Sequence, residues 1–532
     1  MGTSFRSRPV YLAASWMGPV GRYTGKDREE LTFLEMAEQC GQVFAGSPVR
    51  RRHIDAVVVG SQNPAAFSGV DNTAAKMSGI LGISGVKSVL IDTASSSGAS
   101  AFENAYLEVA SGRHDHVLAI AVQKMSDAST LEATRIIAGV IDRNEAEYGL
   151  TMPACGALVA RSLQLRLGLS DLEWSAYSAL LSQRSHRFSS QNPDAHLRQQ
   201  LPVEEYFRQV ATGENYRYWS PLRYHDYCPM SDGMAAVILT SRPQEVMVAG
   251  LGSATDIPTI ADRHYFHSFP ATVTAAGYAY GMAGLRDVRA LEGELHVNMH
   301  DPFNGFGPIN LVDLGIVSRN RLFDALLDDR LTGPGGGFPT NLTGGLKGRG
   351  HPLGATGMIQ VVENHRLIRE AGFEAGLSHS IGGPINNNVV ILLERSEHYH
   401  NRPHEPYRPW GLPSLGHPKP KQVTIDALLA ETGSCVGQFV TSTTRYHHKT
   451  GQPEVILVIV ACRFLGANYR FLFGLDGSHA PQLSGLSTGD ELALERQATS
   501  ITLNRLPVRR LYQRTLQGMR DLAESGWRRL KG

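Results

Sequence analysis

The sequence predicts an α/β protein with two similar halves, followed by a smaller β-rich region. Short β-branched runs such as Ala56–Gly60 and Val117–Val122 alternate with segments whose apolar residues recur at helical spacing. The 55 glycines suit the many tight turns that such alternation needs. With 532 residues, 42% of them hydrophobic, the chain is long enough for about two or three folding units with buried cores.

The first half covers residues 1–122 and is completed by about residues 227–244. Its strand candidates are apolar runs bounded by turn residues, namely Val10–Ala13, Ala56–Gly60, Val89–Ile91, Val117–Val122 and Ala235–Thr240. Residues 123–226 are more polar, and we expect them to form an irregular inserted loop domain.

The second half covers residues 245–395, where the strand–turn–helix pattern recurs. Its strand candidates are Leu295–Met299 and Val389–Leu393. The two halves therefore indicate a weak internal duplication of organisation, without obvious repetition of sequence.

Residues 396–420 are predicted to be a stiff linker, because six prolines lie between residues 401 and 420. His398, His400 and His404 could suggest a metal site, but a solvated linker is the better interpretation. No metal site is therefore expected in this chain.

The last region, residues 421–532, has alternating runs at Gln438–Thr444, Val455–Ala461 and Tyr469–Phe473. These runs predict a small β-barrel of the oligonucleotide/oligosaccharide-binding (OB) type, and a basic amphipathic helix is expected at about 508–530. We expect this region to be a separable module with few contacts across the boundary.

Composition narrows the possible partners and compartment. The net charge of +1 gives no reason to expect nucleic acid or an anionic membrane as a partner. No apolar run approaches transmembrane length, and the first residues lack a signal-peptide pattern. The cysteines are dispersed without a Cys-x-x-Cys pair, which favours reduced thiols and a cytoplasmic location; they are Cys40, Cys155, Cys228, Cys435 and Cys462.

Two turns that each open onto a helix are the candidates for chemistry. Asp92-Thr-Ala-Ser95-Ser-Ser-Gly98 follows a β-branched run and precedes helically spaced apolar residues. Such a turn places Ser95 at a helix N-terminus, where unpaired N–H groups and the helix dipole favour a developing anion. A serine hydroxyl still needs an adjacent base, and the alternative is that these serines only cap the helix. The second turn is Gly350-His351-Pro-Leu-Gly-Ala-Thr-Gly357.

Asn341-Leu-Thr-Gly-Gly-Leu-Lys-Gly-Arg-Gly-His351-Pro-Leu-Gly resembles the thiolase segment that carries the catalytic histidine. The match is closest in style to the sterol-carrier-protein type, whose His-Asp-Cys-Phe element resembles His300-Asp-Pro-Phe303. Two further segments resemble that subgroup, Tyr227–Leu239 and Asn192–Ala195. The ordered matches cover roughly residues 8–395, and the extra C-terminal region resembles that of thiolase-like proteins of actinobacteria. The resemblance implies duplicated βαβαβαββ halves in a five-layer core, and a homodimer.

The resemblance also implies roles for the site residues. Ser95 occupies the place of the cysteine that accepts the acyl group. His351 matches the histidine that helps to activate this nucleophile and to bind the thioester oxygen. His300 matches an element that helps to build the first oxyanion hole, although it could instead be a structural histidine at a strand end.

A second thiol is replaced as well. The family has a Cys-x-Gly-Gly motif whose cysteine is the general acid/base of the condensing step, and Ser380-Ile-Gly382-Gly383 stands there. The resemblance makes Gly382 and Gly383 part of the second oxyanion hole, whereas an ordinary turn before the last strand is the alternative. Ordinary thiolase turnover is put in doubt, because serine is a poor proton carrier near neutral pH.

Three functions remain open. The favoured one is a thiolase-like acyltransferase in which Ser95 forms an oxyester from acyl-CoA, with CoA thioesters as substrates and no permanently bound cofactor. The second is a non-catalytic acyl-CoA-binding or assembly protein. The third is an aldolase-like lyase that cleaves a side-chain thioester, for which Tyr224, Tyr227 and Tyr280 are candidate acid/base residues.

Overall fold

The structure is a computed structural model that describes residues 8–263, 266–405, 434–464, 467–483, 486, 489–497 and 500–505. Most of the predicted proline-rich linker, from residue 406 on, and the expected terminal helix near 508–530 lie outside the described residues.

The main sheet has nine strands in the order β3-β2-β4-β5-β1-β6-β9-β8-β7. In chain order they are β1 (Tyr11–Met17), β2 (Ala56–Gly60), β3 (Lys87–Ile91), β4 (His116–Gln123), β5 (Gly233–Thr240), β6 (Val246–Thr255), β7 (Leu295–Asn298), β8 (Ala375–Gly382) and β9 (Asn387–Arg395). Every strand predicted in residues 8–395 is confirmed, and β6 and β8 are additional.

The strand order shows that the two halves are structural repeats. The first half reads β3-β2-β4-β5-β1, and β7-β8-β9-β6 repeats its last four positions. The directions agree over these four positions as well. The pairs β2–β4 and β7–β8 are parallel, whereas β4–β5 and β5–β1 in the first half, and β8–β9 and β9–β6 in the second, are antiparallel. Where the second half would have a counterpart of β3, Val297 and Thr340 form a single parallel bridge. The predicted internal duplication is therefore confirmed.

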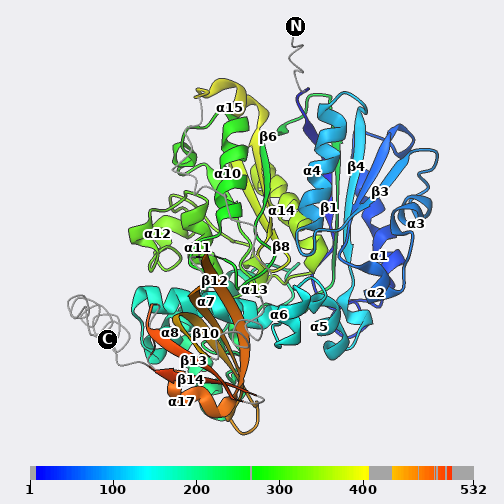
Figure 1. Cartoon of the computed structure of the whole chain (residues 1–532). Helices are drawn as coiled ribbons and strands as arrows, with labels where there is room; N and C mark the ends of the chain where they lie inside the picture. The colour runs from blue at the N-terminus through cyan, green and yellow to red at the C-terminus, as the bar shows by residue number, and fades with distance from the viewer. Residues whose placement is uncertain are drawn as a thin grey trace.

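Alternating side chains in the strands divide the core into layers. In β2, Ala56 and Val58 join a central cluster with helices α4 (Ser97–Ala110) and α14 (Thr356–Glu370), whereas Val57 and Val59 face the outside of the first half. That outer side is covered by α1 (Phe33–Gln39) and α3 (Thr73–Ile80), and the outer side of the second half by α10 (Pro270–Ala283). Figure 1 shows α4 and α14 between the strands of the two halves. The five-layer core predicted for this chain is confirmed.

The segment between β4 and β5 is helical rather than irregular, and its assignment as an inserted loop domain stays a prediction. Its helices are α5 (Thr130–Ala138), α6 (Arg143–Glu147), α7 (Met152–Leu167), α8 (Asp171–Ser189) and α9 (Val203–Thr212). The polar residues that suggested irregularity are partly helix caps: the side chains of Ser129, Thr151 and Ser170 each accept a hydrogen bond from a backbone N–H in the first turn.

The C-terminal region forms an antiparallel sheet in the order β12-β11-β10-β13-β14. Its strands are β10 (Ser434–Tyr446), β11 (Pro453–Phe464), β12 (Ala467–Asp476), β13 (Glu491–Gln497) and β14 (Ser500–Arg505). This arrangement is compatible with a β-barrel-like domain, and the OB type stays a prediction.

Contacts across the domain boundary are extensive, so the expectation of few contacts is wrong. Thr443 Oγ1 donates to the Ser220 carbonyl at 2.6 Å, and Ser220 N donates to the Thr444 carbonyl at 2.8 Å. Leu457 and Ile459 of β11 belong to the same hydrophobic cluster as α7 and α10. The run of apolar residues in β11 explains this, because both of its faces are buried.

The beginning of the predicted linker is also packed against the core. Helix α15 (Ser396–Asn401) follows β9, and His398 contacts Glu394 at 2.7 Å and Glu294 at 3.1 Å. The His400 and His404 rings both pack against Tyr399. His398 is therefore part of the folded core, whereas His400 and His404 are exposed to solvent, as expected. No group of three or more His, Cys, Asp or Glu residues that could hold a metal occurs among the described residues. In the same part of the chain, no helix is long and apolar enough to cross a membrane.

Candidate active site

Ser95 lies in a strained turn between β3 and α4. The preceding residue, Ala94, has a φ of 58°, a left-handed conformation that alanine rarely adopts. Ser95 is half-buried, and within the described residues its hydroxyl has no hydrogen-bond partner. Helix α4 begins two residues later, at Ser97, so the positive end of its dipole lies beside Ser95.

The neighbouring serines hold this turn in place. Ser97 Oγ donates to the Ala94 carbonyl at 2.5 Å and accepts from Thr93 N at 3.0 Å. Ser96 Oγ donates to the Thr93 carbonyl at 2.8 Å, and Ser96, the N-cap residue, makes no side-chain cap bond. The three serines therefore differ: two stabilise the turn, while Ser95 presents a free hydroxyl.

His351 is positioned in the corresponding turn before α14. Its Nδ1 is hydrogen-bonded to Thr356 Oγ1 at 2.8 Å, and its backbone N donates to Ser231 Oγ at 3.3 Å. Burial, and secondarily the charge of Arg349, lowers the pKa of His351 to about 3. The imidazole is therefore neutral at physiological pH, and if Nδ1 carries its proton, the lone pair on Nε2 is free to accept one.

His300 lies directly beside His351. The two rings meet edge to face, with centroids 5.0 Å apart and planes at 89°. Burial, and secondarily the proximity of His351, lowers the pKa of His300 well below its usual value. His300 Nδ1 is buried without a hydrogen-bond partner among the described residues, although its own carbonyl accepts from Asn310 Nδ2 at 2.6 Å. A buried ring nitrogen without a partner suits a group that contacts substrate.

Glycines bring the two turns together. A Cβ on Gly98, three residues after Ser95, would lie 2.7 Å from the carbonyl oxygen of Gly354, three residues after His351. A Cβ on Gly357 would lie 2.6 Å from Ala99 Cβ. The first turns of α4 and α14 are thus in backbone contact, so the Ser95 and His351 turns lie at the same end of the central layer.

The end of β8 completes the site. A Cβ on Gly382 would lie 2.0 Å from the Thr93 carbonyl oxygen and 2.4 Å from Ser96 Oγ, so this glycine presses directly against the Ser95 turn. Gly383 follows with a φ of 61°. Ser380 is 1% exposed, and its Oγ is buried without a partner among the described residues. The structure therefore brings the end of β8 to the same site.

Sequence reasoning missed two buried charged residues near the His351 turn, Lys347 and Asp301. Lys347 Nζ donates to Ser182 Oγ at 3.2 Å and to the His225 carbonyl. Burial lowers the pKa of Lys347 to about 8 and raises the pKa of Asp301, which accepts from Leu346 N at 2.7 Å, to about 6. No sequence pattern pairs these residues, because their partners come from distant segments.

One cysteine lies near the site without replacing the missing thiol. Cys228 N donates to the Pro302 carbonyl at 2.8 Å, which places it beside the segment that carries His300. Burial raises the pKa of the Cys228 thiol to about 12, so it is protonated at neutral pH and a weak nucleophile.

The candidate tyrosines are engaged elsewhere. The Tyr280 hydroxyl donates to the Leu314 carbonyl at 2.7 Å inside the core, and the Tyr227 hydroxyl donates to the Trp219 carbonyl at 3.4 Å. Tyr224 is 55% exposed. None of these contacts favours an acid/base role at the site.

Comparison with known proteins agrees with this geometry. The family model "Thiolase, N-terminal domain" matches residues 10–216, and "Thiolase C-terminal domain-like" matches residues 252–395. An acetyl-CoA acetyltransferase of Methanothermobacter thermautotrophicus is 31% identical over 385 residues, which are 69% of this chain and 95% of that protein. Sterol carrier protein 2 of Gallus gallus is 25% identical over 342 residues, which are 59% of each chain.

A solved structure extends the similarity to the C-terminal sheet. The monomeric SCP2-thiolase like protein type 1 of Mycobacterium smegmatis aligns with a TM-score of 0.68 and 18% identity, covering 94% of this chain and 99% of that one. This likeness concerns the fold. Taken with the family models and the relatives, the chain belongs to the thiolase superfamily, in its sterol-carrier-protein type.

Proposed function

We propose that this chain is a thiolase-like acyltransferase that takes an acyl group from an acyl-CoA thioester onto Ser95. One observation carries the proposal: the Ser95 hydroxyl is the group left free in a strained turn, at the start of a helix whose first turn contacts the His351 turn. The name of the M. thermautotrophicus relative, an acetyl-CoA acetyltransferase, supports a CoA thioester as the substrate.

The proposed chemistry gives each of these groups one role. Ser95 Oγ attacks the thioester carbonyl carbon while His351 Nε2 takes the hydroxyl proton. The α4 N-terminus and the backbone at Gly382 and Gly383 stabilise the negative charge on the carbonyl oxygen. The carbon–sulfur bond then breaks, the CoA thiolate takes the proton from His351, and an oxyester remains on Ser95. CoA leaves as the free thiol.

The carbon–carbon condensing step is not part of the proposal. That step needs a group that exchanges a proton near neutral pH, and Ser380 has a hydroxyl in that position. The buried, unpartnered Ser380 Oγ is instead suited to donate a hydrogen bond to a bound substrate oxygen.

The central test is intact-mass spectrometry after incubation with a panel of acyl-CoA thioesters. The proposal predicts a mass increase of one acyl group on the natural chain and none on Ser95→Ala. Binding of acyl-CoA by calorimetry without any adduct would support the non-catalytic binding function instead. Lyase activity that survives in Ser95→Ala would support the aldolase-like function.

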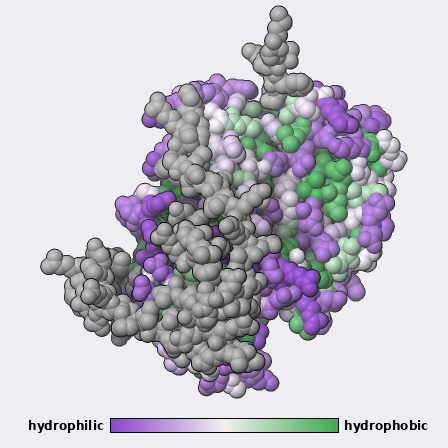
Figure 2. Space-filling view, viewed as in Figure 1, coloured by the Kyte–Doolittle hydropathy of each residue, from purple (hydrophilic) through white to green (hydrophobic). Residues whose placement is uncertain are grey.

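We also propose that the chain forms a homodimer through the β3 side of the first half. Strand β3 ends the sheet order, and Leu90 on it is 38% exposed. Figure 2 shows apolar surface over the part of the molecule where α4 and β3 lie, and Leu107 of α4 is 54% exposed. The similar M. smegmatis protein is described as monomeric, so the question needs a measurement.

Light scattering provides that measurement. A homodimer would give twice the chain mass, and Leu90→Lys would shift it to the monomer. Leu172→Lys is the matched control, because Leu172 of α8 is 73% exposed and lies on another part of the surface. A single-chain mass for the natural protein would contradict the dimer.

The proposal also covers domain boundaries and cellular location. Residues 123–226 and 421–532 are assigned as an inserted domain and an OB-like barrel, with the boundaries predicted from the sequence. A cytoplasmic location is supported by the free thiols of Cys40, Cys155, Cys228 and Cys462. Limited proteolysis and fractionation of cells would test these assignments.

A further inference from the structure

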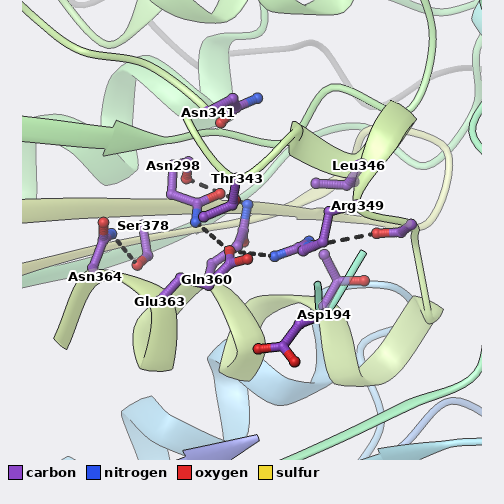
Figure 3. A network of polar contacts seen from close by, with 12 residues as sticks. Asp194, Asn298, Asn341, Thr343, Leu346, Arg349, Gln360, Glu363, Asn364 and Ser378 are labelled. Carbon is purple, nitrogen blue, oxygen red and sulfur yellow. Dashed lines mark hydrogen bonds and ion pairs between the residues drawn. The ribbon is translucent and has the colours of Figure 1, made fainter. Parts of the chain in front are cut away.

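Glu363 of α14 is the centre of a buried polar network next to the site. Its Oε2 accepts from Asn298 Nδ2 at 2.6 Å and from Arg349 Nη1 at 2.5 Å. Figure 3 shows Asn298 and Arg349 approaching Glu363 from two sides. Arg349 is 0% exposed and Glu363 is 4% exposed, so this ion pair lies in the protein interior.

The two partners of Glu363 occupy matching positions in the sequence. Asn298 ends β7 two residues before His300, and Arg349 lies two residues before His351. One carboxylate oxygen thus fixes both segments that present the histidines, and the histidine rings are in edge-to-face contact. Helix α14, which carries Glu363, also carries Thr356, the partner of His351 Nδ1.

We propose that Glu363, Arg349 and Asn298 form a clamp that positions the His300–His351 pair for acyl transfer at Ser95. The three are positioning residues, because they hold the backbone on which the histidines stand. The inference deepens the proposed function and rests on it for the reaction, whereas the placement of the two rings can be measured independently.

The clamp is rigid because its charges are buried. A buried carboxylate that loses its guanidinium partner keeps an uncompensated charge, so alternative arrangements of either side chain are strongly disfavoured. The backbone around the clamp is tied as well: the Arg349 carbonyl accepts from His196 N at 2.8 Å, and the Gly348 carbonyl accepts from Leu197 N at 3.1 Å. The His351 turn is therefore held from both sides.

The test uses the full chain labelled with ¹³C at histidine Cε1. The His300 and His351 signals are assigned with His300→Gln and His351→Gln. The main variant is the double substitution Arg349→Met/Glu363→Met, which removes both charges together and therefore leaves no unpaired buried ion. A clamp predicts that the His300 and His351 signals move or broaden, while the other buried histidines, such as His365, keep theirs.

Two single variants separate the arms of the clamp. Asn298→Ala is expected to change the His300 signal more than the His351 signal. Arg349→Lys keeps a positive charge next to Glu363, so its His300 and His351 signals are expected to stay close to those of the natural chain. The matched control is Arg402→Met/Glu394→Met. The side chains of this Arg–Glu pair, 2.6 Å apart, are also buried, but Glu394 lies at the end of β9 away from Gly382 and the site. It should leave both signals unchanged.

The reaction gives the second readout. The double clamp variant is expected to form the Ser95 adduct about 10- to 100-fold more slowly than the natural chain. Unchanged His300 and His351 signals in that variant would overturn the inference, and so would equal changes in all histidine signals, which would indicate general support of the fold. If the natural chain forms no adduct, the proposed function fails while the spectra still decide on the clamp.

Discussion

The two halves of the core repeat the same strand order, yet they contribute different chemistry to the site. In the first half, α4 buries mainly apolar residues, among them Ala101, Phe102 and Val109. In the second half, the equivalent helix α14 buries Gln360, Glu363 and Asn364. The first half thus presents one hydroxyl on a turn held by local hydrogen bonds. The second half holds its histidines through long-range buried polar contacts.

This difference shows that two structurally repeated halves can hold their site residues in different ways. A turn stabilised by its own backbone and its neighbouring serines can change the residue at its tip without losing its shape. A histidine pair held through a buried ion pair depends on residues from several segments. We therefore expect substitutions at the site to change the free energy of unfolding little in the first half and strongly in the second.

The largest expected effect is on stability, and it tests the difference between the two halves directly. Glu363→Leu leaves Arg349 buried without a counter-charge, so we expect the free energy of unfolding to fall by about 3–5 kcal/mol. Ser95→Ala, in the first half, should change it by less than about 0.5 kcal/mol. Urea unfolding of both variants measures the difference, and equal losses would remove the contrast.

The contact between the halves is expected to be nearly as sensitive. Gly382→Ala places a methyl group 2.0 Å from the Thr93 carbonyl oxygen, so the Ser95 turn must shift. We expect a loss of about 1–3 kcal/mol in unfolding experiments, together with loss of the acyl adduct. Gly79→Ala in α3 is the control, because nothing lies within 4 Å of its added Cβ. A Gly382→Ala protein with normal stability would show that the turn is loosely packed.

Acid sensitivity should come mainly from the second half. Burial lowers the pKa of His351 from 6.5 to about 3, so the folded state binds fewer protons than the unfolded state between these values. Stability therefore falls as the pH decreases from about 6.5 towards 3, by about 1.4 kcal/mol per pH unit for each such histidine. His351→Gln should reduce the slope by that amount in unfolding measured at several pH values. An unchanged slope would mean that His351 is already charged in the folded protein.

The smallest expected effect concerns the strain in the first turn. Ala94→Gly accepts the φ of 58° without a Cβ penalty, so the free energy of unfolding should rise by about 1 kcal/mol. Thermal and urea unfolding would detect this gain. A loss of stability would indicate that the Ala94 methyl group contributes more by packing than it costs in strain.

The sequence predicted most of the fold because most strands are β-branched runs with turns on both sides. It missed β6 and β8 for a physical reason. In β6, Gly250 and Gly252 lower the strand signal, and a Cβ on either would lie 2.2 Å from a carbonyl oxygen of α10. In β8, the small and polar residues around Ser380 belong to the site and hide the strand pattern.

The candidate site was predictable to the extent that it is local. Ser95 and His351 stand in short turns whose residues are consecutive, so their motifs can be recognised in the sequence. The clamp could not be predicted in this way, since Asn298 and Glu363 are 65 residues apart and meet only after folding. One signal was present: polar residues at Gln360, Glu363 and Asn364 interrupt the apolar face of a helix that must be buried.

The central claim is that Ser95 is the acyl acceptor, and peptide mapping tests it most directly. After incubation with acetyl-CoA, the protein is treated with neutral hydroxylamine, which cleaves thioesters much faster than oxyesters, then digested and sequenced by mass spectrometry. The account predicts one acetyl group on the peptide that contains Ser95, retained after hydroxylamine. A hydroxylamine-sensitive acetyl group on the peptide that contains Cys228, or no acetyl group on either peptide, would contradict it.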